Sequence, residues 1–287
     1  MILDGHIHIQ DGPADKAAFK RGLAASGIGG GLVISLAPNC FRREAPGLLD
    51  GAKKRLDGLL QRTRGDENLF PFFWIDPMEP DAERQAEAAL GYGVMGFKVI
   101  CDSYYPYDDK PMALFRAIAG MGKPLLFHSG ILWDGKFSSL YNKPANFEAL
   151  IDIPGLRFSL AHASWPWCDE CIALYGKILN AKSEGPGTSA EMFIDITPGT
   201  PQIYRRDLLV KLYTVGYDIE DNVVYGSDCS FDDYAGEWSG KWVGIDRAIY
   251  NDLKLEQAAV DKAFGGNLRR FVGLGEAKEY RKITPTG

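Results

Sequence analysis

The sequence lacks the long apolar run of a membrane protein and the basic excess of a nucleic-acid-binding protein. No stretch approaches the roughly 18 consecutive apolar residues that a membrane helix needs. The 32 lysine and arginine residues are outnumbered by 38 aspartate and glutamate residues, for a formal net charge of −6 at pH 7. Because no cationic surplus is left to neutralise phosphates, neither nucleic acid nor a membrane surface is expected as a partner.

Cysteine is scarce as well, with five residues scattered along 287. Residues 1–12 show neither the cationic start nor the apolar run of an export signal. We therefore expect a cytoplasmic protein with reduced thiols rather than a disulfide framework. Cys168 and Cys171 have a C-x-x-C spacing. Since no second such pair completes a zinc set, we interpret them as residues in the first turn of a helix.

What the sequence does have is a regular alternation of short strand-like segments and longer helix-like segments. Several strand candidates are apolar throughout, as is typical of parallel strands covered on both faces. The strand candidates are Met1–Ile9, Gly31–Leu36, Leu69–Ile75, Met95–Ile100, Pro124–His128, Arg157–His162, Met192–Ile196 and Asn222–Ser227. The helix candidates are Asp15–Ser26, Gly47–Arg64, Asp81–Leu90, Met112–Met121, Asn146–Ile151, Asp169–Ala181, Ile203–Val215 and Leu255–Val272.

This alternation, with no break in composition, predicts one α/β domain over residues 1–287, folded as a single (β/α)8 TIM barrel. An open doubly wound sheet would alternate in the same way. However, no G-x-G-x-x-G turn follows the first strand candidate, and a His-x-His pair stands there instead. The barrel is therefore the preferred prediction.

The four histidines all lie at or near the ends of strand candidates. His6 and His8 end the first, His128 the fifth and His162 the sixth, while Asp228 follows the eighth. In a barrel, the carboxyl ends of the strands converge on one mouth. Two residues apart on a strand, His6 and His8 point to the same side and can bind one ion. Imidazole and carboxylate donors suit Zn²⁺ best, and also Mn²⁺, Fe²⁺ or Co²⁺, so the cluster predicts a divalent metal site.

Several short motifs occur in a fixed order along nearly the whole chain. They are Asp-Gly-His-Ile-His at 4–8, Gly-Phe-Lys-Val at 96–99, Leu-Leu-Phe-His at 125–128, Leu-Ala-His-Ala-Ser-Trp-Pro-Trp at 160–167, Val-Tyr-Gly-Ser-Asp at 224–228 and Gly-Gly-Asn-Leu-Arg-Arg-Phe at 265–271. Through them the sequence resembles the amidohydrolase superfamily, and in particular its branch related to aminocarboxymuconate-semialdehyde decarboxylase.

The resemblance implies that His6, His8, His128 and Asp228 bind one metal ion. It further implies that Asp228 accepts a proton from a metal-bound water as general base. His162 would polarise the substrate or shuttle protons without binding metal. Binuclear members of the superfamily add a carboxylated lysine from the fourth strand, where Lys98 stands. A second metal with carboxylated Lys98 is therefore the alternative to a plain ammonium group that contacts a substrate anion.

Aromatic loops after the strand candidates are expected to form a pocket for a compact organic molecule. They span residues 101–109, 131–146 and 229–238. Packing in the core explains the aromatic residues equally well, and for Arg42 a solvated surface position is the commoner case. With that alternative open, the predicted substrate-binding residues are Lys98, Trp165, Tyr104, Tyr105 and Arg42.

Together these features predict a metal-dependent hydrolase that uses a metal-activated water on an amide, lactone or ester bond of a small molecule. The same ligands also support non-oxidative decarboxylation of a small aromatic or unsaturated acid by a lyase. A third hypothesis, from another class, is a catalytically inactive barrel that binds a metal or metabolite. Barrels of this kind often pair, so a homodimer is one possible assembly, and the sequence leaves the oligomeric state open.

Overall fold

The computed structural model describes residues 1–38, 49–183 and 188–275, and a single parallel sheet forms its centre. The strands follow one another in the order β8-β7-β6-β5-β4-β3-β2-β1-β9. Their bounds are β1 (Ile2–His8), β2 (Ile28–Ile34), β3 (Leu69–Trp74), β4 (Gly96–Val99), β5 (Leu125–Phe127), β6 (Arg157–Leu160), β7 (Glu191–Asp195), β8 (Val223–Val224) and β9 (Cys229–Ser230).

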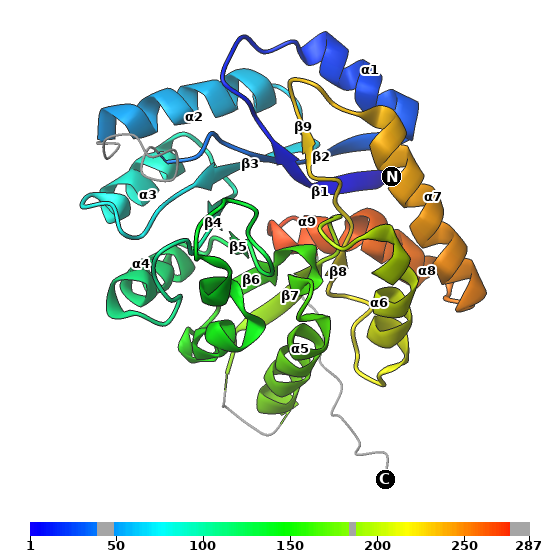
Figure 1. Cartoon of the computed structure of the whole chain (residues 1–287). Helices are drawn as coiled ribbons and strands as arrows, with labels where there is room; N and C mark the ends of the chain where they lie inside the picture. Colours follow the sequence, from blue (N-terminus) through cyan, green and yellow to red (C-terminus); the bar gives the residue numbers. More distant parts are fainter. Residues whose placement is uncertain (39–48, 184–187, 276–287) are drawn as a thin grey trace.

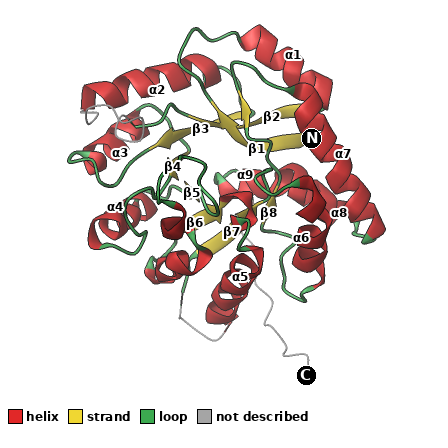
Figure 2. Cartoon of the chain, viewed as in Figure 1, coloured by secondary structure: helices red, strands yellow, loops and turns green. Residues whose placement is uncertain are grey.

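Helices surround this curved sheet on its outer side (Figure 1), and Figure 2 shows the strands gathered inside them. The α-helices are α1 (Lys16–Ser26), α2 (Leu49–Thr63), α3 (Ala82–Gly91), α4 (Asp109–Gly120), α5 (Cys168–Ser183), α6 (Gln202–Thr214), α7 (Gly236–Asp252), α8 (Gln257–Asp261) and α9 (Asn267–Phe271). Short 3-10 segments η1 (Ser139–Asn142), η2 (Pro144–Asp152) and η3 (Ala161–Ser164) and a π-helical turn η4 (Lys262–Gly266) complete the described elements. No helix among the described residues is long and apolar enough to cross a membrane.

Alternate residues of each strand enter different parts of the core. In β3, Phe72 and Trp74 belong to the apolar cluster inside the barrel, while Phe73 belongs to the larger cluster between sheet and helices. This two-residue period explains the apolar strand sequences, because both faces of every strand are covered. On β4, the same period sends Phe97 outward and turns Lys98 to the interior.

The fold is TIM-barrel-like, but its sheet has nine strands and not the eight expected. The expected strand Asn222–Ser227 is reduced to β8, and a separate β9 follows and pairs with β1. The connection stays bonded to β1, because the Gly5 amide donates to the Tyr225 carbonyl at 2.8 Å and the Asp228 amide donates to the His6 carbonyl at 3.0 Å. Asp228 itself has a left-handed φ of 61°. This conformation interrupts regular strand geometry and divides the strand in two.

Two further expectations need correction. Residues 229–238 were expected to form a loop, but α7 begins within them at Gly236. The expected helix Leu255–Val272 consists of α8, η4 and α9, since Gly265 departs from helical backbone geometry. By contrast, α5 begins at Cys168, so Cys168 and Cys171 lie in the first turn of a helix as expected. The described cysteines are all free thiols.

Candidate metal centre and active site

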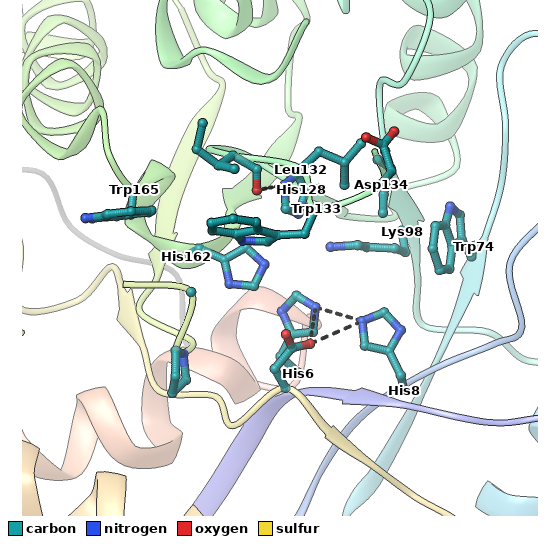
Figure 3. Close-up of a pocket in the computed structure, with 15 residues that line it drawn as sticks. His6, His8, Trp74, Lys98, His128, Leu132, Trp133, Asp134, His162 and Trp165 are labelled. Atoms are coloured by element: carbon teal, nitrogen blue, oxygen red, sulfur yellow. Dashed lines mark hydrogen bonds and ion pairs between the residues drawn. The ribbon is translucent and has the colours of Figure 1, made fainter. Parts of the chain in front are cut away.

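A cavity of about 380 Å³ opens at the carboxyl ends of the strands (Figure 3). Most of the predicted site residues meet there, although they come from strands far apart in the sequence. The lining residues are His6, His8, Trp74, Lys98, Ile100, His128, Ile131, Leu132, Trp133, Asp134, His162, Trp165, Pro198, Gly199 and Asp228. A cavity with apolar walls and a few converging polar groups is typical of small-molecule sites.

Three of the predicted ligands, His6, His8 and Asp228, bring one donor atom each to the same point, and we call them the metal triad. These donors all lie within 4.8 Å of one another. The Nε2 atoms of His6 and His8 are 3.2 Å apart. Asp228 Oδ1 is 3.8 Å from His6 Nε2 and 3.5 Å from His8 Nε2.

These separations fit a single cation. Donors at about 2.1 Å from a tetrahedral metal lie about 3.4 Å from one another. The charge states fit as well, since a histidine must be neutral to bind a metal. Burial lowers the pKa of His6 well below its usual value and that of His8 to about 4. The donor set of two imidazoles and a carboxylate is thus ready to receive a divalent ion.

Asp195, at the end of β7, fixes the orientation of the His6 ring. Its Oδ2 lies 2.7 Å from His6 Nδ1, and both side chains are almost fully buried. A carboxylate can only accept, so Nδ1 carries the proton and the lone pair of Nε2 is left for a metal. Sequence reasoning missed Asp195. The available signal was a lone acidic residue at the end of an otherwise apolar strand candidate.

Asp4 links β1 to the segment that carries Asp228. Its carboxylate accepts the His6 amide at 3.0 Å, the Ser227 amide at 2.9 Å and the Tyr234 hydroxyl at 2.8 Å, and it also accepts from the Ser227 hydroxyl. Burial raises the pKa of Asp4 to about 6 despite these bonds. Because the His6 and Ser227 amides share one carboxylate, the strand that carries His6 and His8 is fixed relative to the segment that carries Asp228.

Asp228 combines a strained backbone with an ionised side chain. Its φ of 61° is rare for a residue other than glycine and tends to occur at functional sites. The preceding Gly226 permits this path, because a Cβ there would lie 2.1 Å from Thr197 Oγ1. Burial alone would raise the pKa of Asp228, but the rings of His6, His162 and His8 lower it overall. Its side chain is 40% exposed, in the cavity.

The predicted ligand His128 and the predicted catalytic residue His162 line the same cavity beside the metal triad. Their rings are 5.0 Å apart, and the ring of His162 is 5.4 Å from that of His6. His128 Nε2 lies 3.2 Å from the Ile131 carbonyl, and His162 Nδ1 lies 3.4 Å from the Thr197 carbonyl. Each carbonyl requires a donor, so the remaining nitrogens, His128 Nδ1 and His162 Nε2, carry free lone pairs when the rings are neutral.

Lys98 is buried in the cavity wall, with only 1% of its surface exposed. Among the described residues, its Nζ has no hydrogen-bond partner. Burial lowers the pKa of Lys98 to about 8, although Asp195 and Asp228 oppose this shift. The ammonium group is the form that remains at neutral pH.

The other predicted substrate-binding residues differ in whether they line the cavity. Trp165 lines the cavity. Tyr104 and Tyr105 do not stand among the described lining residues, because Tyr104 donates its hydroxyl to the Ile100 carbonyl and Tyr105 packs against Tyr107 and Tyr141. Arg42 lies outside the described residues. The loop 131–146, which was expected to form the pocket, contributes residues 131–134, including Trp133. The lining Trp74 was not predicted, since nothing local distinguishes it from a packing residue.

Comparison with known proteins identifies the family to which the chain belongs. A TIM-barrel-like fold with a histidine and carboxylate cluster at its strand ends is an arrangement that occurs in metal-dependent enzymes. A model of the amidohydrolase family matches residues 50–274, which is most of the chain. The chain belongs to the amidohydrolase family. A search of curated protein sequences gave no significant match.

Solved structures agree on the fold. A TIM-barrel protein from Bordetella bronchiseptica superposes with a TM-score of 0.64 at 15% identity, covering 95% of this chain and 98% of that one. For 5-carboxyvanillate decarboxylase from Sphingomonas paucimobilis, the TM-score is 0.63 at 13% identity, with 94% and 98% covered. For dihydroorotase from Campylobacter jejuni, it is 0.58 at 15% identity, with 96% and 84% covered.

Proposed function

We propose that this amidohydrolase is a metal-dependent hydrolase that acts on an amide, lactone or ester bond of a small organic molecule. The observation that carries the proposal is the metal triad, whose three donors, among them the ionised carboxylate of Asp228, stand at the spacing of one cation. His128 is proposed as the fourth ligand, through the Nδ1 that its bond to Ile131 leaves available. A divalent ion bound there, for which we propose Zn²⁺, would supply a Lewis acid that activates water and polarises a carbonyl.

The protein side chains then have separate tasks. Asp228 is ionised and exposed in the cavity, so it is placed to accept a proton from the attacking water as general base. The ring of His162 lies next to that of His6, and its Nδ1 is bonded to the Thr197 carbonyl. We assign to His162 the transfer of the proton to the leaving group: its Nε2 accepts from Asp228 the proton taken from the water, and the resulting Nε2–H polarises the substrate and then donates that proton to the leaving group.

Non-oxidative decarboxylation is the second candidate. The tryptophan-lined walls (Trp74, Trp133 and Trp165) are suited to a planar acid. A decarboxylase and dihydroorotase, a hydrolase, are both among the structures of similar fold. In this reaction Asp228 would take a proton from solvent and deliver it to the carbon that loses CO₂.

The two reactions incorporate different solvent atoms into the product. The enzyme is loaded with Zn²⁺ and screened against esters, lactones and amides of small acids and against aromatic acids, in H₂¹⁸O and in D₂O. A hydrolase places one ¹⁸O atom in the product and releases no CO₂. A decarboxylase releases CO₂ and places one deuterium on carbon. CO₂ release without ¹⁸O incorporation would overturn the hydrolase proposal in favour of its rival.

A catalytically inactive metal-binding or metabolite-binding barrel is the remaining alternative. Asp228→Asn keeps the size of the side chain but removes its basic function. Turnover that disappears in this variant, measured at equal metal content, argues for an enzyme. Absence of turnover across the whole screen, with metal and ligand still bound, would favour the inactive barrel.

Metal stoichiometry tests the cofactor proposal directly. Elemental analysis of the purified protein should find one divalent ion per chain, and chelation should abolish activity that Zn²⁺, Mn²⁺, Fe²⁺ or Co²⁺ restores. A value of two ions per chain would favour the alternative with a carboxylated Lys98. Protein without affinity for any of these ions would contradict the proposal.

A further inference from the structure

Lys98 is the residue of the cavity whose chemistry the metal triad does not explain. Its neighbours across the sheet are Trp74 on β3 and Leu126 on β5, both apolar. The side chain nevertheless turns to the interior and is 99% buried in a wall of the cavity. A buried ammonium group without a partner is unfavourable. Proteins retain such a group chiefly where a bound ligand supplies the missing hydrogen-bond acceptor and negative charge.

The two carboxylates whose charges act on Lys98, Asp195 and Asp228, are committed to other groups. Asp195 accepts from His6 and from the Thr197 amide. Asp228 faces the two histidines of the metal triad. Lys98 forms no hydrogen bond with a described residue. Figure 3 shows the side chain extending away from Trp74 into the cavity, toward the side where His162 lies.

The surroundings of Lys98 select the anion. It is the only lysine or arginine among the described lining residues, and tryptophan and aliphatic side chains form much of the remaining wall. A phosphate would require several donors, whereas a single ammonium group matches one carboxylate. The volume of about 380 Å³ is at the small end for ligand pockets.

We propose that Lys98 binds the carboxylate of the substrate and thereby restricts this enzyme to small planar monocarboxylates, held between tryptophan side chains. The inference rests on the proposed function, because it assigns the cavity to the substrate of that reaction. Since Lys98 and the metal triad face one small cavity, the carboxylate and the reacting bond belong to the same molecule.

Binding to the metal-free full-length protein tests this inference separately from catalysis. The chelated protein is titrated calorimetrically with benzoate, 2-furoate and nicotinate, each compared with its uncharged amide, and with inorganic phosphate. At least one acid should bind about tenfold or more tightly than its amide, as expected for a charge-assisted hydrogen bond. Lys98→Met should remove this preference. Lys177→Met is the matched control, because Lys177 pairs with Glu148 at the exposed surface.

Three outcomes overturn the inference. They are equal or absent binding of acids and amides, phosphate binding as tight as that of the best acid, and an acid preference that persists in Lys98→Met. The Lys98→Met protein should unfold at the same temperature as the wild type or higher, because an unpaired buried charge is removed. If that variant does not fold, protection of wild-type Lys98 from a small amine-reactive reagent decides, with protection by acids but not by amides expected.

The metal-loaded protein separates this inference from the proposed function. A protein that binds no metal but still prefers acids through Lys98 contradicts the metal-dependent reaction and leaves the carboxylate site standing. Two metal ions per chain in the wild type and one in Lys98→Met would assign Lys98 to metal binding instead, and would overturn the inference.

Discussion

The floor and the rim of the cavity are constructed differently. The floor is the metal triad with Asp4 and Asp195, and its polar groups are tied together: Asp195 bonds to His6, and Asp4 joins the His6 and Ser227 backbones. The rim is the segment of residues 131–134 after β5, where the Trp133 side chain is 78% exposed. The floor is thus organised to keep one geometry, which metal chemistry requires. The backbone of the rim is also hydrogen-bonded, at Ile131 and Leu132, but its Trp133 side chain is exposed to whatever enters the cavity.

Removal of the base from the floor should have the largest effect. Asp228→Asn should lower kcat by about 10²–10⁴-fold, the usual contribution of a positioned acid or base. Metal content is measured on the same sample, so that loss of the ion is not mistaken for loss of the base. Asp169→Asn is the control, since Asp169 is an exposed partner of Lys211. An Asp228→Asn enzyme with wild-type kcat would contradict the role of Asp228.

Loss of Asp195, which orients His6, should have the second-largest effect, on metal affinity. Asp195→Asn replaces the acceptor of the His6 Nδ1 proton with an amide that can present its donor side. Metal affinity should fall by about 10–100-fold, as is usual when a partner of a metal-binding histidine is lost. Competition with a fluorescent chelator measures this change. Unaltered affinity would mean that the bond of 2.7 Å does not orient His6 for a metal.

Close backbone approach beneath the floor gives a prediction about stability. In Gly226→Ala the new Cβ would lie 2.1 Å from Thr197 Oγ1 and 3.0 Å from His6 Cβ. The free energy of unfolding should decrease by about 1–3 kcal/mol, the usual cost of overpacking. Gly244→Ala, in α7, is the matched control, because its Cβ would meet nothing within 4 Å. That substitution should be neutral or should stabilise by up to about 1 kcal/mol. Denaturant unfolding of both variants decides.

The floor could be predicted from the sequence to a greater extent than the rim. His6 and His8 were expected together because the strand period fixes their common direction, and Asp228 because barrel strands end at one mouth. Asp195 was not, since one acidic residue in a strand says nothing about the residue it will face. The interruption at Asp228 depends on a single backbone angle, which hydrophobic periodicity does not encode.

Loops and irregular helices were harder to predict for a different physical reason. Tyr104 looks the same in the sequence whether its hydroxyl faces a substrate or, as the structure has it, the Ile100 carbonyl. The helix α7 was not predicted, because Gly236, Gly240 and Gly244 lower its helix propensity. Packing of α7 against α1 and α6 stabilises this helix where local sequence preference does not.

The rim should show the smallest effect on the protein and a selective effect on its substrate. Trp133→Ala should change the free energy of unfolding by less than about 0.5 kcal/mol, because the side chain is mostly exposed. Trp74→Ala, which removes a buried side chain from the same cavity, should cost about 3–5 kcal/mol. If Trp133 covers the substrate, its loss should raise KM while leaving kcat and metal content nearly unchanged, because the groups that do the chemistry stay in place. A Trp133→Ala enzyme that loses metal or kcat as Asp195→Asn does would mean that rim and floor form one unit.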